Sequence, residues 1–128
     1  MQTKRPRNIN PLSISLPIGA LVSITHRLSG ILVFLLIPLF LWGLQISLIS
    51  PEGFNVIRDY LQSPLYKCIA ILAAAGLIFH LLAGIRHLLM DLHIGESLKA
   101  GRFSARLVIL LSLILLILFV YKLGRVAL

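Results

Sequence analysis

The chain has 128 residues and a formal net charge of +8 at neutral pH, yet only 12% of its residues are charged and 59% are hydrophobic. Soluble domains carry about 25% charged residues, so this composition, with a mean hydropathy of +1.00, excludes a soluble domain and predicts an all-α integral membrane protein. The Lys and Arg residues lie at the ends of apolar runs, which indicates cytoplasmic flanks of membrane helices rather than nucleic-acid binding.

The first predicted membrane helix covers residues 18–49 and follows a polar N-terminal arm, residues 1–17, that three prolines interrupt. A bilayer core of about 30 Å needs roughly 20 helical residues, so a helix of this length must tilt or project beyond the core. The excess lies at its N-terminal end. We therefore expect the only polar interruption, the first cluster SITHRLSG at residues 23–30, near the inner membrane interface.

Two further membrane helices are predicted, over residues 64–90 and 104–126. We interpret residues 50–63 as a simple connection, with a short interfacial helix as the alternative. The third helix carries no buried ionisable group, so we assign it to packing and anchoring. The second loop holds His93, Glu96, Lys99, Arg102 and Arg106.

The distribution of Lys and Arg predicts that the N-terminus is inside and the C-terminus outside. Of the 12 basic residues, eight lie on the side of the N-terminus and the second loop, and the other four lie on the opposite side. The eight are Lys4, Arg5, Arg7, Arg27, Arg86, Lys99, Arg102 and Arg106. This topology brings the start of the first helix and the end of the second helix to the same side of the membrane.

The second cluster, FHLLAGIRHLLMD at residues 79–91, closes the second membrane helix. His80 lies among Leu, Ile, Ala and Gly, where an unpaired polar group costs several kcal/mol, so it marks a candidate site. Helical periodicity predicts that His80, Gly84, His87 and Asp91 share one stripe.

A neutral imidazole at His80 lies about 9 Å deeper than the nearest charged residue of its helix. This depth, with room beside Gly84 for a flat group, suits axial ligation of a haem iron. The alternative is a histidine that only hydrogen-bonds to another helix, and spacing alone leaves both interpretations open. Since the chain offers no second histidine of equal depth, a second iron ligand would come from another subunit.

Ser23 and Arg27 are spaced i, i+4 in the first cluster. An interfacial guanidinium beside a hydroxyl can bind the oxygens of a quinone, or carboxylates such as haem propionates. The alternative, which the sequence leaves equally open, is that Arg27 extends to lipid phosphates. We also expect an interfacial ion pair between Asp91 and either Arg86 or Arg27.

The two clusters carry two signatures in the correct order and spacing: an early Arg-Pro followed by SxxHRxS, and then HxxxGxRHxxxD. The matching residues are Arg5, Pro6, Ser23, His26, Arg27, Ser29, His80, Gly84, Arg86, His87 and Asp91. These signatures resemble those of the cytochrome b membrane anchor of succinate dehydrogenase, the succinate:quinone oxidoreductase also known as complex II.

The resemblance implies that His80 is the axial ligand of haem b, and hence a ligand of its iron, and that a second membrane-anchor subunit supplies the other histidine. It implies that Ser23 and Arg27 contribute to the ubiquinone site, and that His26, Arg27 and His87 lie near the haem propionates. His93 stands where the family usually has a small residue, and we expect it at the surface.

The same resemblance implies one membrane-anchor domain over residues 1–128, with three transmembrane helices in a heterodimeric helix bundle. The bundle would dock an iron–sulfur subunit and a flavoprotein subunit and pass electrons from succinate oxidation to quinone, within the respiratory chain and the tricarboxylic acid cycle. With Cys68 as its only cysteine and no nucleotide-binding pattern, this chain is not expected to oxidise succinate itself.

Three further points complete the expectations from the sequence. The arm has no Arg- and Ser-rich presequence, which favours a bacterial inner membrane over a mitochondrial inner membrane. The nearest alternative function is the anchor subunit of a fumarate reductase, which runs the same chemistry in reverse. An alternative of another class is a small oligomeric membrane transporter without haem, which would have no soluble partners.

Overall fold

The computed structural model describes residues 16–126, and four helices account for most of them. They are α1 (Ile18–Ile49), α2 (Pro51–Gln62), α3 (Pro64–Asp91) and α4 (Leu98–Val126). Three of them, α1, α3 and α4, are long and apolar enough to cross a membrane. The described residues contain no strand, so the predicted all-α membrane fold is confirmed. The predicted arm, residues 1–17, lies almost entirely outside the described residues.

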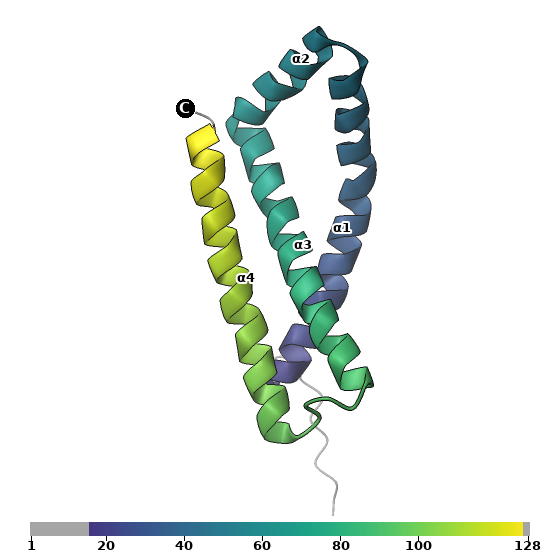
Figure 1. The fold of residues 1–128 in the computed structure, drawn as a ribbon, viewed down its shortest axis with the longest axis vertical. Coiled ribbons are helices and arrows are strands. Elements are labelled where there is room, and N and C mark those ends of the chain that lie inside the picture. Colours follow the sequence, from purple (N-terminus) through teal and green to yellow (C-terminus); the bar gives the residue numbers. More distant parts are fainter. Residues whose placement is uncertain (1–15, 127–128) are drawn as a thin grey trace, which may run out of the picture.

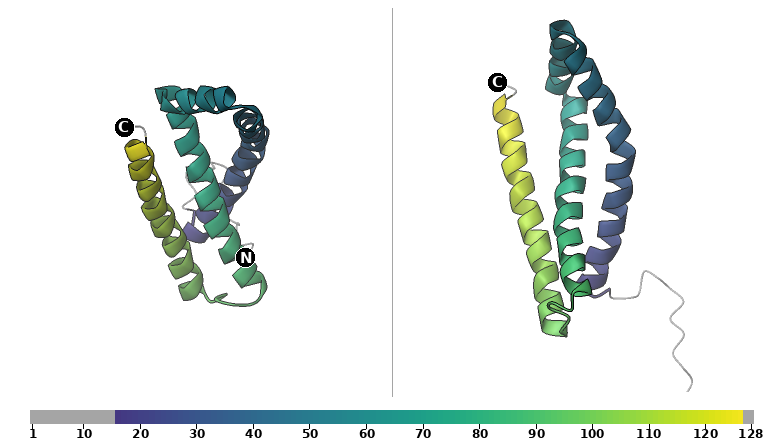
Figure 2. Two further views of the ribbon diagram at one scale, coloured as in Figure 1. Left: turned by 45° about the horizontal axis from the view of Figure 1, so that its top comes forward. Right: turned by 45° about the vertical axis from the view of Figure 1, so that its right-hand side comes forward.

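The long helix α3 lies between α1 and α4 (Figures 1 and 2). The chain runs along α1, turns through α2 at one end, returns along α3 and then follows α4 back. The start of α1, the end of α3 and the start of α4 therefore meet at the end opposite α2, where α1 crosses α3 (Figure 1). The two polar clusters lie together at this end, as the sequence predicts.

Small side chains allow the three long helices to approach each other where they cross. Val22 of α1, Ala83 of α3, and Ala105 and Val108 of α4 form the buried core at this end. Most large apolar side chains elsewhere are exposed on this single chain, as expected of a membrane subunit whose outer faces contact lipid or other helices.

The connection between α1 and α3 differs from the preferred interpretation, because it contains the 12-residue helix α2. Ser50 caps this helix by accepting a hydrogen bond from the backbone amide of Gly53 at 3.0 Å, and Pro51 begins its first turn. A side chain at Gly53 would collide with the carbonyl oxygen of Ile46, so the glycine permits the tight turn from α1. A short helix in this connection, which was the alternative, is thus observed.

The helix α4 begins at Leu98, six residues before the predicted start. Ser97 caps it, since its hydroxyl accepts from the amide of Ala100 at 3.2 Å and its carbonyl accepts from that of Gly101 at 2.8 Å. Lys99, Arg102 and Arg106 consequently lie on the first three turns of α4, and the prediction that they belong to a loop is wrong.

His93 lies in the short loop that remains between α3 and α4. Its φ of 61° falls in the left-handed region, which glycine adopts more readily than other residues. The side chain of His93 is 83% exposed and donates a hydrogen bond to Glu96 at 2.8 Å. It is a surface residue, as expected.

Candidate functional site

Three histidine rings stack on one another where α1 crosses α3. The ring of His26 from α1 lies between two rings of α3, with its centroid 4.4 Å from that of His80 and 4.9 Å from that of His87. The interplanar angles are 19° and 21°. His80, Gly84 and His87 of the predicted stripe therefore face the first cluster of α1, whereas Asp91 is exposed.

The hydrogen bonds of the stack define which ring nitrogens carry protons. Nδ1 of His80 lies 3.2 Å from the backbone carbonyl oxygen of His26, and Nδ1 of His87 lies 2.9 Å from that of Ala83. Because a carbonyl oxygen only accepts, both Nδ1 atoms are donors, and in the neutral rings both Nε2 atoms keep a free lone pair. Nε2 of His26 is buried without a hydrogen-bond partner among the described residues.

Ser29 holds the His80 side of the stack. Its hydroxyl donates to the carbonyl oxygen of His26 at 2.7 Å and lies 3.4 Å from Nδ1 of His80. Ser29 matched the first signature, but its contact with His80 depends on how the two helices cross. The structure thus adds Ser29 to the candidate site as a residue that orients His80.

Two glycines allow the rings to approach the helix backbones. A Cβ atom on Gly30 would lie 2.9 Å from Cε1 of His80, and one on Gly84 would lie 3.4 Å from Nε2 of His26. The sequence predicts room beside Gly84 for a flat group, and in the structure the imidazole of His26 approaches this position.

Arg86 is buried, with only 8% of its surface exposed, and it faces α4. Its Nε donates to the hydroxyl of Ser104 at 3.1 Å, and its Nη2 donates to the carbonyl oxygen of Gly101 at 3.3 Å. The predicted ion pair of Asp91 with Arg86 or Arg27 is absent from residues 16–126. The early start of α4 explains this difference for Arg86, because it places two uncharged acceptors of α4, Ser104 and Gly101, beside the guanidinium.

Ser23 and Arg27 lie on α1 close to the stack but do not hydrogen-bond to it. Ser23 is half-buried and Arg27 is exposed. Neither side chain makes a hydrogen bond or an ion pair with another residue in the described range, so both keep their donors available. In residues 16–126, no three His, Cys, Asp or Glu side chains converge to hold a bare metal ion.

Residues 1–119 match the family described as the succinate dehydrogenase/fumarate reductase transmembrane subunit. The chain is 38% identical over 119 residues to the succinate dehydrogenase cytochrome b556 subunit of Coxiella burnetii, covering 92% of this chain and 95% of that protein. It is 32% identical over 103 residues to the subunit of the same name from Paracoccus denitrificans, covering 80% and 79%. The corresponding subunit of Rickettsia felis is 28% identical over 112 residues, covering 88% and 87%. The chain therefore belongs to the succinate dehydrogenase/fumarate reductase transmembrane subunit family, as its two signatures predict.

Proposed function

We propose that this chain is the cytochrome b membrane-anchor subunit of a bacterial succinate:quinone oxidoreductase, in which it binds haem b and forms part of the ubiquinone site. Family membership, the bacterial relatives named as cytochrome b556 subunits and the three apolar helices support this proposal. The chain would lie in the inner membrane with its N-terminus inside, as the positions of its basic residues suggest.

The hydrogen bond of His80 to the carbonyl oxygen of His26 is the observation that carries the haem proposal. A histidine that binds a metal nearly always donates its other ring N–H to a carbonyl, a carboxylate or water, which fixes the tautomer. The ring of His26 stacks on the face of the His80 ring, and Nε2 at the edge of the His80 ring would be the nitrogen that holds the iron. Haem bound there would supply a one-electron redox centre.

The remaining nitrogens of the stack suit the haem propionates. The buried Nε2 of His26 lacks a partner within the described chain, and a buried polar atom of this kind needs one. The imidazole of His87 is held by its Nδ1, which donates to Ala83, so it would donate to a carboxylate only when Nε2 also carries a proton. Arg27 adds an exposed guanidinium on the same part of α1 and would pair with a propionate or with quinone.

Ser23 and Arg27 would hold the quinone, because their side chains have no partner within residues 16–126 and they are one helical turn apart. A quinone accepts two electrons and two protons at its carbonyl oxygens, so negative charge develops there. A hydroxyl and a guanidinium aimed at one oxygen stabilise this charge through short, charge-assisted hydrogen bonds. Succinate itself would be oxidised in the docked flavoprotein subunit, and electrons would arrive through the iron–sulfur subunit.

A second membrane-anchor subunit would supply the other iron ligand, which completes the proposed heterodimeric bundle. The soluble subunits would dock at the end where α1 begins and α4 starts. Succinate oxidation is preferred over fumarate reduction as the physiological direction, because the relatives named above are succinate dehydrogenase subunits. Nothing in the family match favours the transporter alternative.

The haem proposal is tested by a reduced-minus-oxidised optical spectrum of the complex purified with its partners. We expect a low-spin b-type signal in the wild type that is lost or shifted in His80→Leu. The matched control is His93→Leu, because the side chain of His93 is exposed and lies in the loop after α3, outside the stack. A wild-type complex without haem, or a His80→Leu complex with an unchanged spectrum, would refute the assignment.

The quinone proposal is tested by Arg27→Leu, with two electron acceptors in parallel. We expect quinone reduction to fall about 10- to 100-fold, which is the range for losing a hydrogen bond to a charged group. Electron transfer from succinate to a water-soluble artificial acceptor should stay unchanged, since it does not use this site. Arg125→Leu at the other end of the bundle is the control, and full quinone reductase activity in Arg27→Leu would contradict the proposal.

A further inference from the structure

A large apolar cavity lies at the end of the bundle opposite the histidine stack. It has a volume of about 620 Å³ and is formed by the end of α1, by α2 and by the start of α3. A second cavity of about 530 Å³ continues between α1 and α3 and shares Phe40 and Ala70 with the first. Because the two cavities share these lining residues, we treat them as one groove, called here the α2 groove, that runs from α2 down to Val33 and Leu77. Leu123 and Phe119 of α4 also line it.

The depth of the α2 groove matches one leaflet of a membrane. Its α3 wall runs from Tyr66 to Leu77, and 11 residues of helix rise about 16 Å. Half of a hydrocarbon core of about 30 Å is about 15 Å. An acyl chain that enters at α2 therefore reaches the end of the groove near the midplane.

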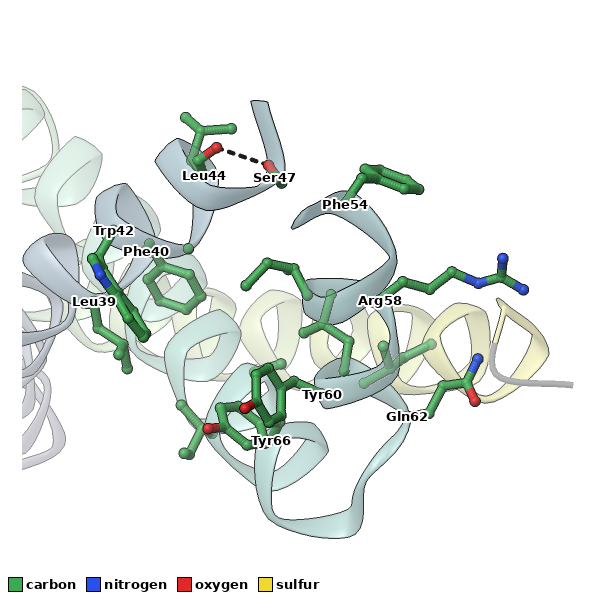
Figure 3. A pocket seen from close by; sticks show the side chains of 16 residues that line it. Leu39, Phe40, Trp42, Leu44, Ser47, Phe54, Arg58, Tyr60, Gln62 and Tyr66 are labelled. Carbon is green, nitrogen blue, oxygen red and sulfur yellow. Dashed lines mark hydrogen bonds between the residues drawn. The ribbon is translucent and has the colours of Figure 1, made fainter. Parts of the chain in front are cut away.

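The polar residues of the groove lie at its α2 end. Figure 3 shows Arg58 and Gln62 on one side of the pocket and the rings of Phe40 and Trp42 on the other. The rings of Tyr60 and Tyr66 lie 5.0 Å apart beside them, as aromatic residues do at the level of lipid headgroups. Arg58 is exposed and forms no ion pair within residues 16–126, so its positive charge is available to a ligand.

We propose that the α2 groove is a binding site for an anionic phospholipid of the leaflet on the α2 side. One acyl chain lies in the groove past Phe40 and Ala70, and the phosphate pairs with the guanidinium of Arg58. A phosphate suits the unpaired charge of Arg58, because it carries a full negative charge and pairs with a guanidinium through charge-assisted hydrogen bonds. The wall of the groove between the headgroup and the membrane midplane is apolar. It accommodates the acyl chain, which needs no polar contacts.

Photocrosslinking in the assembled complex tests this site. The complex is reconstituted into vesicles of phosphatidylcholine and phosphatidylglycerol that contain a trace of phosphatidylglycerol with a diazirine in its acyl chain. After illumination, labelled peptides are mapped by mass spectrometry. We expect label on residues 39–44 of α1 and residues 66–77 of α3.

Two variants probe the two parts of the site. Arg58→Gln should lower labelling about fivefold, which is the loss expected when one basic side chain no longer meets an anionic headgroup. Ala70→Phe narrows the groove where the two cavities join and should abolish label on residues 73–77. The controls are Arg125→Gln, which removes a charge outside the groove at the same end, and Leu110→Phe on an exposed face of α4.

Three outcomes would overturn the proposal. One is equal labelling in Arg58→Gln and Arg125→Gln, since the headgroup would then not depend on Arg58. Another is a wild-type groove without lipid label, which would assign it to a helix of a partner subunit. The third is displacement of the lipid probe by a ubiquinone analogue but not by unlabelled phosphatidylglycerol, which would assign the groove to quinone. None of these results bears on the haem or on Arg27.

Discussion

Replacing Gly30 with alanine is the sharpest test of how the chain orients His80. The added Cβ atom would lie 2.9 Å from Cε1 of His80, whereas ordinary contacts begin at 3.4 Å. The imidazole must therefore retreat by at least the difference between these distances. It cannot do so freely, because Nδ1 is bonded to the carbonyl oxygen of His26 at 3.2 Å and the ring of His26 covers one face.

The size of the effect follows from these contacts. Overpacking a well-packed site costs about 1–3 kcal/mol, which corresponds to roughly a 5- to 150-fold change in an equilibrium constant. Disturbing the hydrogen bond that orients a metal-binding histidine usually weakens metal affinity by about 10- to 100-fold. The two estimates describe the same displacement and agree. We expect Gly30→Ala to weaken haem binding by about 10- to 100-fold.

The measurement is the rate at which the assembled complex loses haem to an excess of a haem-scavenging globin. The matched control is Gly43→Ala on the same helix, where a Cβ atom meets nothing within 4 Å. Gly43→Ala should lose haem at the wild-type rate, while Gly30→Ala should lose it about 10- to 100-fold faster. Equal rates in both variants would show that His80 does not hold the haem in the orientation described.

Two other predictions concern the framework of the chain. Arg86→Met removes two hydrogen bonds from a buried guanidinium and should lower the free energy of unfolding by about 2–5 kcal/mol in denaturant titrations of the complex, whereas exposed Arg106→Met should change it little. At the start of α2, the backbone amide of Glu52 and the Ser50 hydroxyl hold the pKa of the Glu52 carboxyl below its ordinary value of 4.5. The stability that this carboxylate contributes is therefore present above pH 4.5 and is lost as the pH falls through the lowered pKa. Ser50→Ala should raise this pKa, as followed by carbon NMR of labelled glutamate, and an unchanged titration would contradict the cap.

The boundaries of α1 and α3 could be predicted closely because the sequence marks them at both ends. Pro17 precedes the first apolar run, and Ser50 with Pro51 follows it. The start of α4 could not be found from hydropathy, since its first three turns carry Lys99, Arg102 and Arg106 and so resemble a loop. The only signal was Ser97, whose capping role depends on local backbone geometry.

In the candidate site, helix periodicity predicts which residues share a face, but it does not predict which residues meet where two helices cross. That His80 and His87 share one face of α3 follows from their spacing. That the ring of His26 lies between them depends on the crossing of α1 and α3, which no local pattern specifies. The partners of Arg86 were missed for a related reason, since Gly101 and Ser104 become its neighbours only once α4 begins at Leu98.

Where α1 crosses α3, some polar groups have hydrogen-bond partners in the described chain and others do not. The second set indicates where groups from outside the chain would bind. Arg86 is satisfied within the chain, and so are the Nδ1 atoms of His80 and His87. The Nε2 atoms of all three stacked histidines bond to no residue in the described range, although the stack lies in membrane-spanning helices. Of these atoms, Nε2 of His26 is buried, and an unpaired buried polar atom is costly in a membrane, so another group is needed to meet it. Iron at His80, a carboxylate at an Nε2–H of His26, and a carboxylate at a His87 that is protonated on both nitrogens would meet all three, and this supports the proposed haem over a histidine that serves packing alone.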